Sequence, residues 1–299
     1  MICGMLALYL IFKKDLRLTM KLRKYFFLVV TFMVAFVACG VKAQAASTYT
    51  GGTPTVFVHG LQGTHGSTDT MIRDLSQRYS GTQKVMTINV KPNGELETTG
   101  RFQKVKHPLV QINFLNNSAN TTTNSHWLNK ALTYLYQKKG VRNVNIVAHS
   151  AGNVAVYQAL AAQAAHTPKT NKFVILAGPF DGVLSLNDQA NKNKVNPKDH
   201  YKPSIMYPAN SYYPSYQQLM QLSTAFPKTV KVLNVYGNLG DGSNSDSLVT
   251  NASSLSVNYL LRHQKTPVQN KCFKDAKATH SGLHKSTKVD NWIADFLWK

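Results

Sequence analysis

Short apolar runs alternate with longer amphipathic stretches along the chain, and this alternation predicts strands interleaved with helices. A short apolar run bounded by turn residues is typical of a buried strand, whereas apolar positions three or four apart indicate one face of a helix. The predicted strands are 55–58, 84–90, 144–147, 172–177 and 229–236. The predicted helices are 67–79, 125–139, 153–165, 217–225 and 289–298.

Local signals refine some of these boundaries. Ser67 is suited to cap the start of the first helix, and Gly140 is suited to end the second. Residues 101–114 alternate weakly between apolar and polar positions, which predicts an extra pair of strands there.

Strands that alternate with helices imply an α/β fold with a mostly parallel sheet covered by helices on both faces. No Pro/Gly/Ser-rich linker divides the chain after the first 46 residues, so we expect a single domain. Residues 182–214 break the rhythm and are rich in Asn, Lys, Pro and Tyr, which indicates an insertion over one edge of the sheet. This insertion is either a lid or wall of a binding site, or a passive surface loop with half-buried tyrosines.

The first 46 residues have the pattern of a signal peptide, preceded by an extension over 1–19. Met20 opens a basic stretch, residues 25–41 are apolar, and Ala43-Gln44-Ala45 fits a cleavage site. The remainder, 47–299, is then the exported domain. Two alternatives stay open: a lipoprotein signal ending at Cys39, or an uncleaved N-terminal anchor at the short limit for spanning a membrane.

The chain is strongly basic, with a formal net charge of +21. The first 46 residues hold seven Lys or Arg and one Asp, so about +15 remains without them. Such a charge attracts polyanions, and for an exported protein we expect an anionic cell-wall polymer or a membrane surface. The lysines are scattered and no nucleic-acid motif is present, so we expect no nucleic-acid partner. High solubility of a monomer is the simpler explanation of the charge.

The segment Ala148-His149-Ser150-Ala151-Gly152 carries the clearest chemical signal. It joins an apolar strand to a helix, and a serine on such a sharp turn presents its hydroxyl above the sheet. Ala148 stands where the G-x-S-x-G pattern has its first glycine. We therefore predict Ser150 as a nucleophile, the alternative being a serine that only caps a helix.

A serine nucleophile needs a base to take its proton and a carboxylate to orient that base. Asp246 lies in the loop after a late strand and is the predicted acid, with Asp181 and Asp241 as alternatives. His280 precedes the last helix and is the predicted base, with His284 as the alternative.

Backbone N–H groups would stabilise the oxyanion that forms during attack. The N–H of Ala151 follows the nucleophile directly, and the turn after the first strand would supply the second donor through Leu61. We expect His59 to order this turn and His149 to pack beside the nucleophile rather than to act as the base.

These motifs, in this order, resemble those of an α/β-hydrolase. The oxyanion turn, serine turn, acid loop and histidine loop are similar to those of the small bacterial lipases, among which the Ala-x-Ser-x-Gly form is known. Residues 173–182, Leu283-His284 and 293–298 also resemble an uncharacterised family of exported Gram-positive cell-surface hydrolases.

The resemblance implies a secreted or cell-surface serine hydrolase that cleaves a carboxylic ester with a Ser-Asp-His triad. Its substrate would be a small-molecule or lipid ester, and neither a metal nor a cofactor is needed. An amidase or peptidase on the same triad, or a basic cell-wall-binding protein that has lost activity, are the alternatives.

Overall fold

The computed structural model describes residues 48–299. The predicted signal peptide, its 1–19 extension and the two alternatives to cleavage all concern residues outside this range. None of the helices in the described range has the length and apolarity that crossing a membrane requires.

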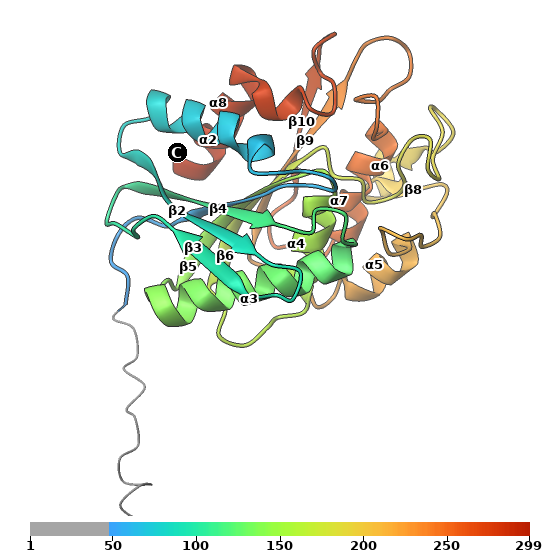
Figure 1. The fold of residues 1–299 in the computed structure, drawn as a ribbon. Helices are drawn as coiled ribbons and strands as arrows, with labels where there is room; N and C mark the ends of the chain where they lie inside the picture. The colour runs from blue at the N-terminus through green and yellow to red at the C-terminus, as the bar shows by residue number, and fades with distance from the viewer. Residues whose placement is uncertain (1–47) are drawn as a thin grey trace, which may run out of the picture. The chain divides into compact units, whose positions relative to one another are not determined.

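An eight-stranded sheet forms the centre of the domain, in the order β10-β9-β6-β5-β1-β4-β2-β3 (Figure 1). Every neighbouring pair is parallel except β2 and β3, which are antiparallel. The strands are β1 Thr55–Val58, β2 Thr82–Val90, β3 Leu96–Thr99, β4 His107–Phe114, β5 Asn143–His149, β6 Lys169–Leu176, β9 Lys231–Asn238 and β10 Gln269–Lys274. The predicted, mostly parallel sheet is therefore confirmed.

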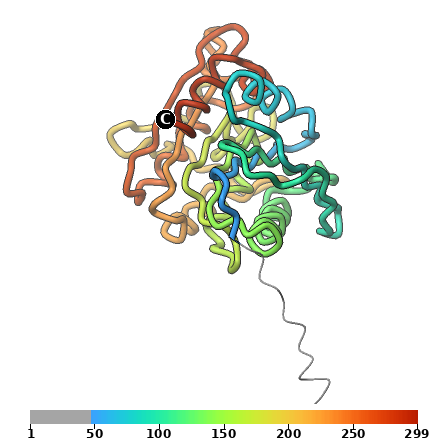
Figure 2. The backbone as a smooth tube through the Cα atoms, turned by 90° about the vertical axis from the view of Figure 1, so that its left-hand side faces the viewer, coloured from blue at the N-terminus to red at the C-terminus, as the bar shows by residue number. Residues whose placement is uncertain are grey.

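Helices cover both faces of the sheet, as the alternating pattern predicts (Figures 1 and 2). On one face lie α3 Thr121–Lys139, α4 Ala151–Ala161, α5 Tyr216–Leu222 and α7 Val257–Leu260, and on the other α2 Gly66–Arg78 and α8 Thr287–Trp298. Successive side chains of a strand point to opposite faces. Val56 and Val58 accordingly pack into the core beneath α3 and α4, whereas Phe57 packs beneath α2 and α8.

The predicted helix ends are partly right. Gly140 ends α3 in the left-handed conformation, with φ of 69°, which glycine adopts without strain. The start of α3 lies earlier than predicted because the Asn120 side chain caps it by accepting from the Thr123 N–H. Ser67 does not cap α2, since the helix already begins at Gly66; its hydroxyl accepts from the Thr64 N–H instead.

Three elements differ from the prediction. Within residues 101–114 only His107–Phe114 form a strand, the single buried strand β4 rather than a pair, and the strand β3, which pairs with β2, lies earlier in the chain. The edge strand β10 was missed because five of its six side chains are at least partly exposed, so it lacks an apolar run. Two short helices, α6 Asn251–Leu255 and α7, were missed because Ser and Asn dominate the segment.

The insertion 182–214 follows β6 in the chain and contains the small antiparallel pair β7 Val195–Asn196 and β8 Lys202–Pro203, with a 3₁₀-helix at Pro197–Asp199 between them. Two buried carboxylates hold it. Asp181 accepts from the Tyr207 N–H at 2.9 Å and from the Asn193 amide at 2.9 Å. Asp188 accepts from the Tyr207 hydroxyl and from the Thr250 hydroxyl, both at 2.7 Å. The insertion is thus fastened to the segment that follows the acid loop.

A third buried carboxylate, Asp290 in the first turn of α8, has no such partners. Only 1% of its surface is exposed, and neither carboxyl oxygen finds a hydrogen-bond donor among residues 48–299. Burial, with the nearby Asp74, raises the pKa of Asp290 to about 7, although Arg78 acts in the opposite direction. The folded state therefore binds this proton more tightly than the unfolded chain does.

Replacing Asp290 by Asn should make the protein relatively more stable at high pH. The aspartate contributes stability that is complete below about pH 4 and is lost as the pH rises through about 7, whereas Asn does not titrate. The difference in unfolding free energy between variant and wild type should grow with pH by up to about 1.4 kcal/mol per pH unit. Denaturant titrations at pH 4, 6 and 8 measure it; a difference that does not change with pH would contradict the pKa shift.

Candidate active site

Ser150 sits on a strained turn between β5 and α4. Its φ of 55° and ψ of −134° place a non-glycine residue in a sparsely populated region, which persists only where neighbours hold it. The Ser150 N–H donates to the Leu176 carbonyl at 2.9 Å. The Asn153 side-chain amide donates to the Ser150 and Leu176 carbonyls, at 2.9 and 2.8 Å. This fixes the serine at the carboxyl edge of the sheet, with its side chain lining a cavity.

Glycines on either side of this turn permit a close approach of the backbone. A Cβ atom at Gly60 would lie 2.6 Å from the Ser150 Cβ and 2.9 Å from the His149 carbonyl oxygen. A Cβ atom at Gly152 would lie 2.5 Å from the His59 carbonyl oxygen. The turn after β1 and the serine turn can therefore pack side by side only with glycine at these positions.

Asp246 and His280 form a buried pair beside the serine. The His280 Nδ1 and the Asp246 Oδ2 are 2.9 Å apart, and the two side chains are only 9% and 1% exposed. The other oxygen, Oδ1, accepts from the Leu248 and Val249 N–H groups at 2.9 and 2.7 Å. The carboxylate is thus held on the Nδ1 side of the ring, and the Nε2 side remains for the cavity that Ser150 also lines.

The main chain of His280 is held from two directions. Its N–H donates to the Asp246 carbonyl at 2.7 Å, and its carbonyl accepts from the His149 Nε2 at 2.9 Å. Burial is the main reason why the pKa of His149 is well below its usual value, and the neighbouring His280 and His284 lower it further. His149 is therefore a neutral N–H donor, as its predicted packing role requires.

The alternative acids and base lie in different surroundings. Asp181 faces the insertion, and burial raises its pKa to about 7. Asp241 lies in an exposed turn, where it accepts from the Ser243 N–H at 2.9 Å. His284 lines the cavity, but its Nδ1 has no partner among the described residues, and burial lowers its pKa to about 4. The structure brings Ser150, Asp246 and His280 together and leaves both alternative acids outside.

The turn after β1 is rigid. The His59 Nε2 accepts from the Phe114 N–H at 2.9 Å, so its Nδ1 carries the proton and donates to the Gly60 carbonyl at 2.8 Å. The Gln62 N–H donates to the Asn117 carbonyl. Within residues 48–299 neither the Leu61 N–H nor the N–H of Ala151, the first residue of α4, makes a backbone hydrogen bond. Neither predicted oxyanion donor is therefore used in a backbone hydrogen bond within the described residues.

The cavity at this site has a volume of about 290 Å³ and mixed walls. The insertion contributes Val183 and Tyr213, and the acid loop contributes Leu248 and Val249. The remaining lining residues are Gly60, Leu61, Gln62, Gly63, Ser67, His149, Ser150, His280, Ser281 and His284. Across residues 48–299, no three His, Cys, Asp or Glu side chains converge as metal ligands would.

Several contributors were not predicted from the sequence. Asn153 looks like any polar residue on a helix, yet its amide fastens the serine turn to β6. Val183 and Tyr213 reach the cavity only because the insertion folds back over the edge of the sheet. Asn117, which accepts from the Gln62 N–H, lies in a loop with no recognisable motif.

A family model described as an alpha/beta hydrolase of unknown function (DUF915) matches residues 42–299. The chain belongs to this family. Its fold is close to that of a Listeria innocua gene product, with a TM-score of 0.69, 23% identity, and coverage of 83% of this chain and 94% of that one. A candidate cell surface hydrolase of Lactobacillus plantarum follows, with a TM-score of 0.64, 16% identity, and coverage of 83% and 91%. A comparison with curated proteins found no match.

The contact between Gly60 and the serine turn provides a test of the site's geometry. A Gly60→Ala Cβ would collide with backbone and Cβ atoms that cannot rotate away, so the variant should lose about 2 kcal/mol or more of stability. Gly66→Ala is the matched control, because the nearest atom to its new Cβ is 3.4 Å away. That variant should range from unchanged to about 1 kcal/mol more stable. Thermal unfolding of both proteins measures the difference, and equal midpoints would show that the close approach is wrong.

Proposed function

We propose that this member of the alpha/beta hydrolase family is a serine hydrolase that cleaves carboxylic esters. The observation that carries the proposal is the buried 2.9 Å contact between Asp246 and His280 on the wall of the cavity that Ser150 lines. A carboxylate that orients an imidazole beside a serine is the arrangement that activates a hydroxyl for attack on an acyl carbon.

In the proposed reaction the Ser150 Oγ attacks the ester carbonyl while the His280 Nε2 takes the hydroxyl proton. Asp246 holds the ring and stabilises the imidazolium. The Leu61 and Ala151 N–H groups donate to the oxyanion. His280 then protonates the departing alkoxide, leaving an acyl-serine ester, and the same residues activate water to release the acid.

The other two histidines of the site suit this cycle because they stay uncharged at neutral pH. Burial lowers the pKa of both His149 and His284. The centres of their two rings are 4.7 Å apart, and the centre of the His149 ring is also 4.7 Å from that of the His280 ring. A positive charge on either ring would oppose the imidazolium that forms on His280, so their neutrality favours proton transfer.

The size and walls of the cavity favour a compact acyl group. Its volume of about 290 Å³ lies at the lower end of the range for small-molecule sites, roughly 300–1,000 Å³. Apolar side chains from the insertion and the acid loop form one wall. Short-chain esters therefore suit the site better than long acyl chains. In this proposal the insertion acts as an acyl-binding wall.

We place the enzyme outside the cell, at the cell surface. The support is the signal-peptide pattern of the first 46 residues, together with the similarity to a candidate cell surface hydrolase. Detection of mature protein beginning near residue 46 in a secreted or wall fraction tests the location.

Removal of the nucleophile or the base should abolish ester hydrolysis. Ser150→Ala and His280→Ala should each lower kcat/KM on p-nitrophenyl acetate or butyrate by about 10³-fold or more. Thermal unfolding should change little in Ser150→Ala, whereas His280→Ala should also lower stability because it leaves the buried Asp246 without its partner. His284→Ala is the matched control and should retain activity within about tenfold, because His284 contacts no carboxylate in the described chain. An active wild type with an equally active Ser150→Ala variant would rule out the assignment.

The ester preference has its own test. An amine is a poorer leaving group than an alkoxide and needs more help from the general acid. The wild type should therefore hydrolyse a p-nitrophenyl ester at least about 10²-fold faster than the matched p-nitroanilide. Comparable rates, both lost in Ser150→Ala, would instead assign an amidase.

A further inference from the structure

The positive charge of the domain is concentrated at the end of the sheet where the parallel strands begin. Six segments meet there. Five are the connections that lead into β4, β5, β6, β9 and β10, and those leading into β6, β9 and β10 include the first residues of the strand. The sixth is the end of α8. They are residues 100–106, 136–142, 162–172, 224–231, 261–271 and 295–299, which we call the basic edge. These segments contain 14 Lys or Arg residues and a single acidic residue, Asp295.

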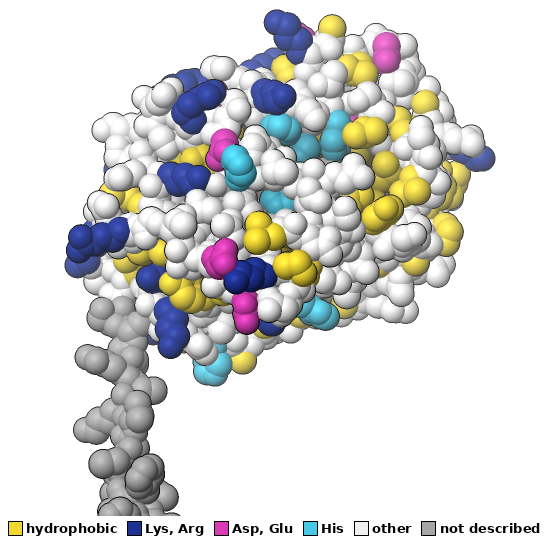
Figure 3. Space-filling model, viewed as in Figure 1, with side chains coloured by type: hydrophobic (Ala, Val, Ile, Leu, Met, Phe, Trp, Pro, Cys, Tyr) yellow, Lys and Arg dark blue, Asp and Glu magenta, His cyan; other side chains and the backbone are white. Residues whose placement is uncertain are grey.

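The remainder of residues 48–299 is close to neutral. It contains the other 13 of 27 basic residues and 11 of 12 acidic residues, including the buried carboxylates around the candidate active site. On the side drawn in Figure 3, Lys and Arg side chains gather over the left-hand part, and apolar side chains gather on the right, over the insertion. The net charge thus belongs to one end of the molecule.

Hydrogen bonds show that the six segments are neighbours. Lys169 N–H donates to the Arg142 carbonyl at 2.9 Å, and Lys265 N–H donates to the Lys228 carbonyl at 3.0 Å. The Lys172 ammonium donates to the Phe296 carbonyl at 2.7 Å, which joins β6 to the end of α8. Tyr49 joins residues 100–106 to residues 136–142, because its hydroxyl donates to the Gln103 carbonyl and its N–H donates to the Gly140 carbonyl. The pairing of β6 with β9 places Lys172 beside Lys231 and so joins residues 162–172 to residues 224–231. The six segments that carry the fourteen basic residues therefore lie together at one end of the sheet.

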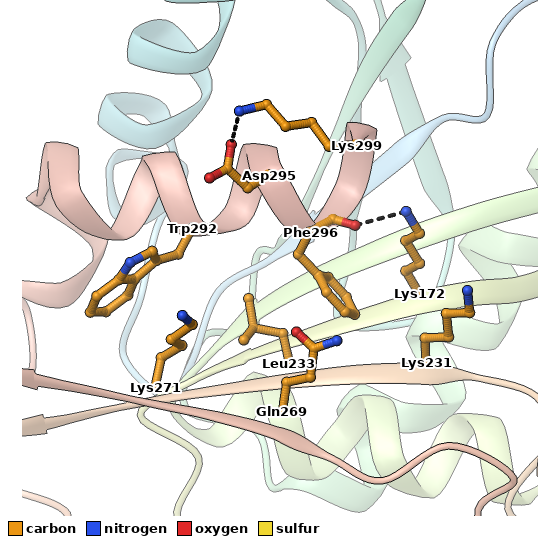
Figure 4. A pocket seen from close by; sticks show the side chains of 9 residues that line it. All are labelled: Lys172, Lys231, Leu233, Gln269, Lys271, Trp292, Asp295, Phe296 and Lys299. Carbon is orange, nitrogen blue, oxygen red and sulfur yellow. Dashed lines mark hydrogen bonds and ion pairs between the residues drawn. The ribbon is translucent and has the colours of Figure 1, made fainter.

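A groove of about 340 Å³ lies within the basic edge, between α8 and strands β6, β9 and β10 (Figure 4). Lys172 and Lys231 face each other directly across neighbouring strands, where like charges repel. Lys271 and Trp292 line the opposite part of the groove, with the ammonium 5.8 Å from the ring centre. Asp295, the one carboxylate of the groove, is already paired with Lys299 at 2.6 Å.

No carboxylate within residues 48–299 forms an ion pair with Lys231 or Lys271. Both side chains are exposed. The mutual repulsion of these like charges does not stabilise the folded protein, because it opposes the compact state. An anion that binds across the groove would relieve the repulsion.

We propose that the basic edge is a binding surface for a flexible phosphodiester polymer of the cell envelope, with the groove beside α8 as its main contact. Eleven of the 14 basic residues are lysines, whose ammonium groups bind phosphate as point charges without a fixed orientation. Arg142 and Arg262 are occupied, each lying over a tyrosine ring and donating to a backbone carbonyl. The surface would therefore recognise its ligand through repeated positive charges, and a polymer with regularly spaced phosphates matches such a surface.

The arrangement also sets the orientation of the bound protein. The cavity with Ser150 opens at the carboxyl ends of the strands, opposite the basic edge. A protein held by its basic edge would turn this cavity away from the polymer, so binding and hydrolysis can proceed together. The polymer is thus an attachment site rather than the substrate.

The test measures binding of the mature-length chain, 47–299, to soluble poly(glycerol phosphate) by titration at several salt concentrations. The double variant Lys231→Glu/Lys271→Glu should bind at least about tenfold more weakly and with a shallower salt dependence. The matched control, Lys194→Glu/Lys198→Glu, makes the same change in net charge at exposed positions of the insertion and should bind within about twofold of wild type.

Three outcomes would overturn the proposal: no binding by wild type, equal losses in the two double variants, or tighter binding to duplex DNA or to vesicles of phosphatidylglycerol than to the polymer. Equal losses would mean that net charge alone acts. Hydrolysis of p-nitrophenyl acetate by the groove variant should stay within about twofold of wild type, with or without saturating polymer. Because binding is measured directly, its failure is distinguishable from failure of the proposed ester hydrolysis.

Discussion

The hydrogen bond between Asp246 and His280 is the contact on which the candidate site depends. The aspartate follows β9 and the histidine follows β10, so the bond joins two loops at the carboxyl edge of the sheet. It is buried, and the second carboxylate oxygen of Asp246 accepts from two backbone N–H groups. Such a buried hydrogen bond holds one geometry strongly, because losing either member leaves an unpaired polar group.

The serine turn adds a second constraint to this pair. Ser150 keeps a strained backbone because Asn153 and the Leu176 carbonyl hold it, and Gly60 leaves room for it beside the turn after β1. His149 links the two constraints, since it precedes the serine and donates to the His280 carbonyl. The parallel strands thus bring the serine turn and the Asp246–His280 pair to one cavity, although different contacts hold each of them.

Much of the sheet could be predicted from the sequence because its central strands are buried on both faces and are therefore continuously apolar. The same logic fails at β10, where exposed Gln, Lys and Cys side chains give no apolar run. The serine turn could be predicted because its sequence pattern is local: an apolar strand, a serine with small neighbours, and a following helix. The choice of His280 over His284 rested only on spacing, since both lie in one loop.

Contacts between distant segments lie beyond such patterns. Nothing near Asn117 or Val183 in the sequence indicates that they contact the oxyanion turn and the cavity. The concentration of charge is similar: the basic residues are scattered along the chain, and 14 of the 27 in residues 48–299 come to one end because the parallel strands begin there. Basic residues that are scattered along a sequence can therefore lie together in the folded protein.

Reaction with a fluorophosphonate, followed by peptide mapping, tests the central claim most directly, because only an activated serine attacks such a reagent at neutral pH. We expect one adduct, on Ser150, that forms at least about 10²-fold more slowly in Asp246→Asn. No adduct on Ser150 in a folded wild-type protein, or labelling at an unchanged rate in the Asp246 variant, would contradict it.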